Sequence, residues 1–487
     1  MNLTSLTART ASVLCAAVIL TGAFAVNAAS LTITNVKGGP ISGARVMIGM
    51  RENVPFPGNI LTSDAQGHVQ TPVQWTDSQP VTIDANGFVR ATYFGRLPQD
   101  ATLALNETPQ NSHFELRGQT TNFTGMNSSP GYGHVGLIYP AISRSKAASF
   151  QIANLISPVS DTISIIGKHV DVPSNLTFPS QTVTYILPIH LDKPDYRFYL
   201  PESRNWKMVA SHMRFPVQQV VDEIRSGKSI FDVLNLFEMV EASVKDVNVG
   251  RGSTSRNLPV NEVDFSHSIP VTAPGFDSHY NMLAFSMAES GGLFYMTDLK
   301  RLQPHGHMRL NSPGSNSHGL LVSVLTRADQ KISVDYMMMR PTTGAQIEEG
   351  SAVIQPANHS QAFEFLPIVQ PPQLHGKTLV LAPPTHSVAG IEATLTYAAL
   401  SKVEILQSGK LKLEKKTPQW ELYATDWASS LDLPEMPVTR RVDATELLAP
   451  MRWEALFGGQ PAGTPKATVG PDTLEKVSHV TRSAVDI

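Results

Sequence analysis

Apolar residues recur at every second position along much of this chain, in short runs separated by turn residues. Val46 and Ile48 show this spacing, and Val81 and Ile83 show it again shortly before Asn86-Gly87, a dipeptide typical of hairpin turns. Alternation of this kind is typical of strands with one buried face. The pattern predicts about seven strands between residues 31 and 105, and we expect a small antiparallel sandwich over residues 29–108.

The same period of two returns in the second half of the chain. Leu320, Val322 and Val324 share one face of a predicted strand, and Ile391 and Leu395 share one face of another. Frequent prolines divide the stretch before residue 262 into short strands. We therefore predict a mainly β protein, with a β-rich segment at 109–261 and a larger β-sandwich at 262–459.

One stretch, residues 216–247, has helical periodicity instead. Val217, Val220 and Ile224 fall on one helix face, and a Ser229/Asp232 capping pattern precedes a second apolar stripe that begins at Phe231. This spacing predicts a helical hairpin inserted into the β-rich segment. The predicted second helix is acidic, which argues against a DNA-reading helix-turn-helix.

The two ends of the chain have different characters. Arg9 is followed by a short apolar run and by Val26-Asn27-Ala28, which predicts a secretory signal peptide over residues 1–28. The single cysteine, Cys15, lies inside that run, so the processed chain would have no thiol. Residues 460–487 are polar and poor in core residues, and we expect a disordered tail there.

Composition narrows the class of function. The formal net charge is -3 and only 16% of residues are charged, so no global attraction to nucleic acid is expected. After the signal peptide no apolar run is long enough to span a bilayer. We expect an exported protein of the periplasm or the extracellular space, with no nucleic-acid partner and no transmembrane segment in the mature chain.

Three motifs in the first module carry a family resemblance. They are Gly39-Pro40-Ile41-Ser42-Gly43-Ala44-Arg45-Val46, Thr62-Ser63-Asp64-Ala65-Gln66-Gly67 and Val81-Thr82-Ile83-Asp84-Ala85-Asn86-Gly87-Phe88. In order and spacing, this stretch resembles the carboxypeptidase regulatory-like (transthyretin-like) domain. The resemblance covers about 75 residues and implies a non-catalytic accessory module of exported proteins, similar in shape to some carbohydrate-binding domains. Phe88 stands where the family more often has tyrosine.

Motifs for catalysis are scarce. The sequence contains no His-Glu-x-x-His zinc motif, no Gly-x-Ser-x-Gly elbow and no phosphate-binding loop. His305 and His307 would share one face of a strand, with His318 further on, so a metal site is one interpretation and a solvated turn is the other. No cofactor is predicted.

These observations favour an exported, non-catalytic β-sandwich protein with a binding or structural role. Its partner would be a glycan or a cell-envelope protein, and Trp75, Tyr93 and Tyr132 are the candidates for stacking on sugar rings, unless they are core aromatics. One alternative is a secreted metal-dependent hydrolase that uses the region of His305, His307 and His318. Another is an assembly protein that joins its neighbours through sheet edges.

Overall fold

The computed structural model describes most of the chain after the predicted signal peptide. Residues 29–487 are described apart from 110–113, 127–130, 149–154, 156, 158, 166–167, 186–187, 229–232, 315–317, 328–347, 358–360, 409–410, 438–449 and 466–468. The predicted signal peptide lies outside the described residues. Strands dominate the molecule, which confirms the predicted mainly β class. No helix among the described residues is long and apolar enough to cross a membrane.

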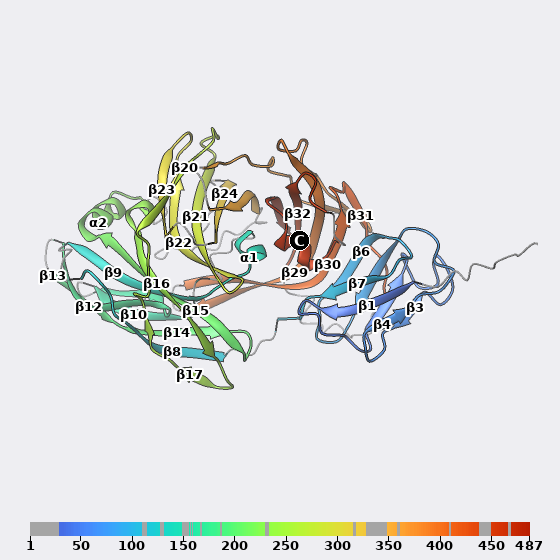
Figure 1. Cartoon of the computed structure of the whole chain (residues 1–487), viewed down its shortest axis with the longest axis horizontal. Helices are drawn as coiled ribbons and strands as arrows, with labels where there is room; N and C mark the ends of the chain where they lie inside the picture. Colours follow the sequence, from blue (N-terminus) through green and yellow to red (C-terminus); the bar gives the residue numbers. More distant parts are fainter. Residues whose placement is uncertain are drawn as a thin grey trace, which may run out of the picture.

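The N-terminal module lies at one end of an elongated molecule (blue in Figure 1). Its seven strands form two facing layers around a core that includes Leu31, Ile33, Val46 and Ile83. The first layer contains β1 (Ser30–Asn35), β4 (His68–Gln70) and β7 (Ala101–Leu105). The second contains β2 (Arg45–Ile48), β3 (Ile60–Thr62), β5 (Gln79–Asp84) and β6 (Arg90–Arg96). The expected sandwich is present, with one departure from antiparallel order, because β1 and β7 pair in parallel.

The second layer of this module is the end of a twelve-stranded sheet. β6 pairs in parallel with β30 from the distant C-terminal part of the chain, so the module is hydrogen-bonded to the rest of the molecule. The other strands of this sheet are β21 (Tyr280–Ser290), β22 (Leu293–Leu302), β24 (Gly319–Arg327), β25 (Glu348–Pro356), β29 (Ile391–Ser408), β30 (Leu411–Thr425), β32 (Met451–Pro461) and β33 (His479–Asp486).

The predicted disordered tail at 460–487 is wrong. After a 3-10 turn at Pro471–Glu475, β33 lies between β25 and β32 and pairs with both. The polar residues that suggested disorder are satisfied inside the sheet. The hydroxyl of Ser483 donates to the carbonyl of Gln370 at 2.7 Å, and that of Thr481 donates to the carbonyl of Pro367 at 2.9 Å.

Two small sheets cover faces of the large one and complete the predicted larger sandwich. β20 (His267–Thr272), β23 (His307–Ser312) and β26 (Gln361–Ala362) form one cover, with Val271 and Leu310 in a core shared with β21 and β24. β27 (Gln373–His375), β28 (Thr378–Val380) and β31 (Ser430–Asp432) form the other, with Leu379 packed among residues of β29, β30 and β32.

Residues 114–264 form a further strand-rich region at the opposite end (cyan to green in Figure 1). A six-stranded sheet contains β9 (Tyr132–Pro140), β12 (Leu176–Thr184), β13 (Pro188–Lys193), β15 (Asn205–Pro216), β16 (Glu238–Asn248) and β19 (Val263–Asp264). A smaller sheet contains β8 (Phe114–Thr121), β14 (Asp195–Leu200), β17 (Ser253–Ser255) and β18 (Leu258–Pro259). The hairpin of β10 (Ser160–Ile165) and β11 (Lys168–Pro173) stands beside them, and a short helix, α1 (Arg144–Ala148), follows β9.

The predicted helical hairpin at 216–247 is half wrong. Its first helix is present as α2 (Val217–Arg225), but its second half contains a 3-10 turn at Leu234–Leu236 and then strand β16. The predicted Ser229/Asp232 capping pattern lies outside the described residues. β16 pairs antiparallel with β15 from Asn205↔Asn248 to Arg214↔Glu238, and this pairing overrides a local apolar spacing that fits either element.

Candidate functional site

Two of the three aromatic residues predicted to stack on sugars are buried. Trp75 is 3% exposed and Tyr93 is 2% exposed. The indole of Trp75 donates to the carbonyl of Asp77, and the hydroxyl of Tyr93 donates to the carbonyl of Ala104. Neither ring is open to a ligand, so the structure corrects both assignments in favour of the core. Tyr132 is 40% exposed, with the Arg214 guanidinium 5.7 Å from its ring centroid.

The three histidines of the predicted metal site do not converge. His305 lies in the turn between β22 and β23 with a positive φ of 56°, and His307 is the first residue of β23, paired with Thr272. Strand β21 lies between the two sites and measures their separation. At one site, His318 comes directly before Gly319, which pairs with Ala288 of β21. At the other, the turn comes after Leu302, which pairs with Met282 of β21. Six residues of strand separate these positions, or about 20 Å. No group of three potential ligands from His, Cys, Asp and Glu is found among the described residues.

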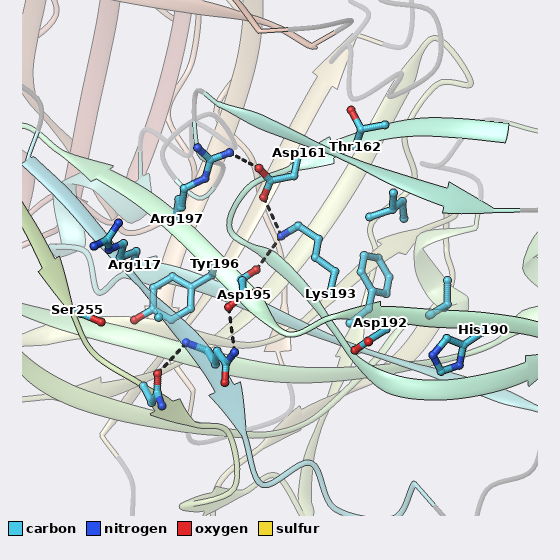
Figure 2. Close-up of a pocket in the computed structure, with 16 residues that line it drawn as sticks. Arg117, Asp161, Thr162, His190, Asp192, Lys193, Asp195, Tyr196, Arg197 and Ser255 are labelled. Carbon is cyan, nitrogen blue, oxygen red and sulfur yellow. Dashed lines mark hydrogen bonds and ion pairs between the residues drawn. The ribbon is translucent and has the colours of Figure 1, made fainter. Parts of the chain in front are cut away.

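A polar groove of about 840 Å³ lies in the 114–264 region (Figure 2). Its floor is the outward face of the β8–β14–β17 sheet, and its walls come from β10, β12 and β13. Alternation along β8 and β14 places their apolar residues in the core and their polar residues toward the groove. Half of the lining residues are charged or amide, and the other half includes the apolar Ile163 and Leu191 and the aromatic Phe178 and Tyr196.

Asp161, Lys193 and Arg197 form an ion-pair network on the groove wall. The Asp161 carboxylate accepts from the Lys193 ammonium at 3.0 Å and from the Arg197 guanidinium. The Lys193 ammonium also donates to the carbonyls of Leu176 at 2.7 Å and Asp195 at 2.8 Å. Its donors are therefore used within the protein, and Lys193 is a structural member of the site.

The network shifts the pKa values of its members. Partial burial raises the pKa of Asp161, but hydrogen bonds from Lys193 and Arg197 outweigh that effect and lower it below its ordinary value. Burial lowers the pKa of Lys193, and the bond to Asp161 offsets part of that shift. The bond to Asp161 raises the pKa of Arg197. The shifts of Asp161 and Arg197 both favour their charged forms.

The floor of the groove is organised in rows across the sheet. Arg197 of β14 lies directly opposite Arg117 of β8, which in turn lies opposite Ser255 of β17. In the next row Gln119 donates its side-chain amide to the Asp195 carboxylate at 3.0 Å, and its backbone N–H donates to the Asn257 side chain at 3.0 Å. These rows place hydrogen-bond donors and acceptors side by side along the groove.

The groove has two chemically different ends. Figure 2 shows Arg117 and Arg197 at one end and His190 and Asp192 at the other. The neighbouring floor strands β8 and β14 meet only in the fold, since they are about eighty residues apart in sequence. One signal of the groove is present in the sequence, outside the motifs considered for the candidate sites. In both strands charged residues alternate with buried ones, as in Asp195, Arg197 and their buried neighbours Tyr196 and Phe198.

A second polar cluster lies in the core beside the groove region. The Thr124 hydroxyl donates to the Glu241 carboxylate at 2.8 Å, the His212 Nδ1 lies 2.8 Å from the same oxygen, and the His212 Nε2 lies 2.8 Å from the His134 Nδ1. His134 and His212 are 2% and 1% exposed. Glu241 is 6% exposed, so only Thr124 of this cluster reaches solvent, and we interpret the buried histidine–glutamate line as a structural network.

No family model and no curated protein matches the chain. Among solved structures, the TIE protein of Bacillus anthracis matches 69% of this chain at 10% identity and a TM-score of 0.15, and the chain spans about half (49%) of its length. A streptococcal ancillary pilin matches 61% of this chain and 88% of its own length at 8% identity and a TM-score of 0.14. The major pilin subunit of Bacillus cereus matches 61% of this chain and 87% of its own length at 10% identity and a TM-score of 0.15. TM-scores this low do not establish a shared fold, so any functional argument depends on the groove itself.

Proposed function

We propose that this protein is an exported, non-catalytic β-sandwich protein that binds a glycan of the cell envelope or its surroundings in the polar groove. The observation that carries the proposal is the groove floor, where guanidinium, amide, carboxylate and hydroxyl groups line up on a rigid sheet. Sugar hydroxyls donate and accept hydrogen bonds, and a mixed row of this kind satisfies both roles. Export rests on the signal-peptide pattern in residues 1–28.

We further propose that the N-terminal module is a carboxypeptidase regulatory-like accessory domain. Its seven strands in two layers support this assignment. So do the glycines of the three quoted motifs, because Gly43, Gly67 and Gly87 have φ values of 72°, 78° and 83°. Such values favour glycine and explain why the turns of the motifs contain it. In this role the module supports the larger β region and carries no chemistry.

A blocking substitution tests the proposed function. Ser255 lines the groove next to Arg117, and its strand position accommodates a large side chain, so Ser255→Trp is expected to fill the groove. Purified residues 29–487 are applied to an array of cell-wall and host glycans, and Ser255→Trp is expected to abolish the binding that the unmodified chain shows.

The matched control is Ser253→Trp. Ser253 is exposed on the same strand and opposite Glu115, outside the groove, so this variant is expected to bind like the unmodified chain. Binding to no member of the array, or binding that Ser255→Trp leaves unchanged, contradicts the proposal and favours a protein partner.

A further inference from the structure

Arg117 and Arg197 are like charges in directly opposed positions of an antiparallel strand pair. They are registered Cα partners, and alternation places both side chains on the groove face. Directly opposed Cβ atoms lie about 5 Å apart, and like charges at this distance destabilise a sheet. A protein that retains such a pair on a groove floor has a local excess of positive charge there.

Over the whole groove the charges balance, since three cations, Arg117, Lys193 and Arg197, are matched by three carboxylates, Asp161, Asp192 and Asp195. The excess is therefore local to the arginine pair. Asp161 is shared between Lys193 and Arg197, so one carboxylate faces two cations. The Arg117 guanidinium has no hydrogen bond or ion pair with any of the residues that the structure describes. Glu115, two residues along β8 on the same face, acts electrostatically on Arg197 but forms no ion pair with Arg117.

We infer that the two arginines bind the carboxylate of an acidic sugar at the end of a saccharide chain, an inference that rests on the proposed function. A guanidinium offers a planar pair of donors that matches a carboxylate, and two of them facing one site give both charge and orientation. The Ser255 hydroxyl, next to Arg117, is placed to bond the same sugar.

The rest of the groove selects against a chain that is acidic throughout. Asp195 and Asp192 lie further along, with carboxylates that accept hydrogen bonds from neutral sugar hydroxyls. A second acidic sugar in that direction would face these carboxylates and be repelled. The groove therefore fits a single terminal acidic residue followed by neutral ones.

Matched pairs of saccharides test the inference by calorimetry. Sialyllactose is compared with lactose, cellobiouronic acid with cellobiose, and an oligogalacturonate serves as the fully acidic ligand. The unmodified chain is expected to bind at least one singly acidic member at least about tenfold more tightly than its neutral partner, and more tightly than the oligogalacturonate. Its affinity should fall as salt is raised.

Substitution of Arg117 tests whether the preference for the singly acidic saccharide arises in the groove. Arg117→Gln is expected to reduce the tenfold preference to near one while leaving the affinity for the neutral partner intact, and Arg117→Lys is expected to restore it only in part. Arg251→Gln, at an exposed loop arginine outside the groove, is the control and should behave like the unmodified chain.

The outcomes separate the two proposals. The arginine inference is overturned if the unmodified chain binds acidic and neutral saccharides equally well. If that binding is lost in Ser255→Trp but unchanged in Arg117→Gln, glycan binding in the groove is retained. Absence of binding to every saccharide overturns both. A preference for the oligogalacturonate overturns the claim that one terminal acid is recognised.

Discussion

At the scale of single residues, His134, His212 and Glu241 form a buried line whose proton positions follow from its hydrogen bonds. The Glu241 carboxylate accepts a hydrogen bond from His212 Nδ1–H, which leaves His212 Nε2 to accept a hydrogen bond from His134 Nδ1–H. His134 Nε2 is then a bare nitrogen, and it has no partner among the described residues. A second proton on His134 would have no acceptor in the core.

Burial, the neighbouring His212 and the more distant Arg214 together lower the pKa of His134 from 6.5 to about 4. Because the folded-state pKa is the lower one, its contribution to stability is complete above pH 6.5 and is lost as the pH falls toward 4. His134→Phe is expected to flatten this part of the pH dependence. It should also cost about 1–3 kcal/mol at neutral pH, since His212 Nε2 loses its partner. Chemical denaturation at a series of pH values measures both effects.

His190→Phe provides the comparison, since His190 is exposed at the groove and far less buried. Its pH profile is expected to follow that of the unmodified chain. An unchanged profile in His134→Phe would show that acid sensitivity in this range arises elsewhere.

Residue type by itself predicted little of the candidate site. Trp75 and Tyr93 were reasonable choices for sugar stacking, but a ring serves the core or the surface according to which side of the sheet it faces. Arg117 and Arg197 become a pair only through the register of β8 and β14, strands joined by about eighty intervening residues. No local pattern contains that register, so the groove emerges only with the fold.

At the scale of elements, the alternation of apolar and polar residues predicted the strands well and their boundaries less well. The alternation at Val46 and Ile48 and at Val81 and Ile83 predicted β2 and β5 correctly, because these residues lie in the core of the module. The residues between them, Met47 and Thr82, are buried as well, so these two strands are covered on both faces. The failures share a cause. Residues of β16 have an apolar spacing that fits either a helix or a strand, and residues of β33 are polar enough to suggest a tail, but pairing with neighbouring strands makes both of them strands.

Deletion of β33 tests how far the large sheet depends on this strand. Removing residues 478–487 leaves β25 and β32 with unpaired edges and exposes the sites filled by Val480 and Ala484, which are 2% and 1% exposed. We expect loss of a cooperative unfolding transition and aggregation on expression, measured by circular dichroism and size-exclusion chromatography. Ile487→Ala, which trims a side chain that is 62% exposed and keeps the backbone hydrogen bond to Met451, should change stability by less than about 0.5 kcal/mol. A soluble, cooperatively folded deletion product would contradict the assigned role of β33.

At the scale of the whole molecule, the N-terminal module is joined to the C-terminal sheet through a buried polar junction. Tyr93 of β6 stacks on its strand neighbour Tyr423, with ring centroids 5.2 Å apart. Glu421 is 3% exposed and accepts from the Asn106 amide at 3.0 and 3.1 Å, and from the hydroxyls of Tyr397 and Tyr423. The module is therefore held by pairing that continues one sheet across the boundary, and we expect it to unfold together with the region that carries β30.

Asn106→Asp tests this coupling by placing a second carboxylate against Glu421. Burial raises the pKa of Glu421 above 4.5, so its protonated form favours the folded state, and that contribution is lost as the pH rises. In the variant, the buried Glu421 carboxylate and the half-buried carboxylate at position 106 repel each other once both ionise. Its loss of unfolding free energy should grow from pH 4.5 upward and reach about 3–5 kcal/mol near neutrality. Tryptophan fluorescence is a suitable readout, since the Trp420 indole donates to the Thr92 hydroxyl at the junction.

Asn86→Asp is the control that separates the junction from the added charge. Asn86 is exposed in a hairpin turn of the same module, so this variant gains the same charge without a buried partner and is expected to lose little stability at any pH. If Asn106→Asp unfolds the module alone, at lower denaturant than the rest, the shared sheet joins two units that are stable independently. If it matches Asn86→Asp, the Glu421 contacts do not hold the module. A single transition that moves as a whole, with a pH-dependent midpoint, is the result that a continuous sheet requires, because β6 and β30 can separate only by breaking the hydrogen bonds and core contacts on both sides of the boundary.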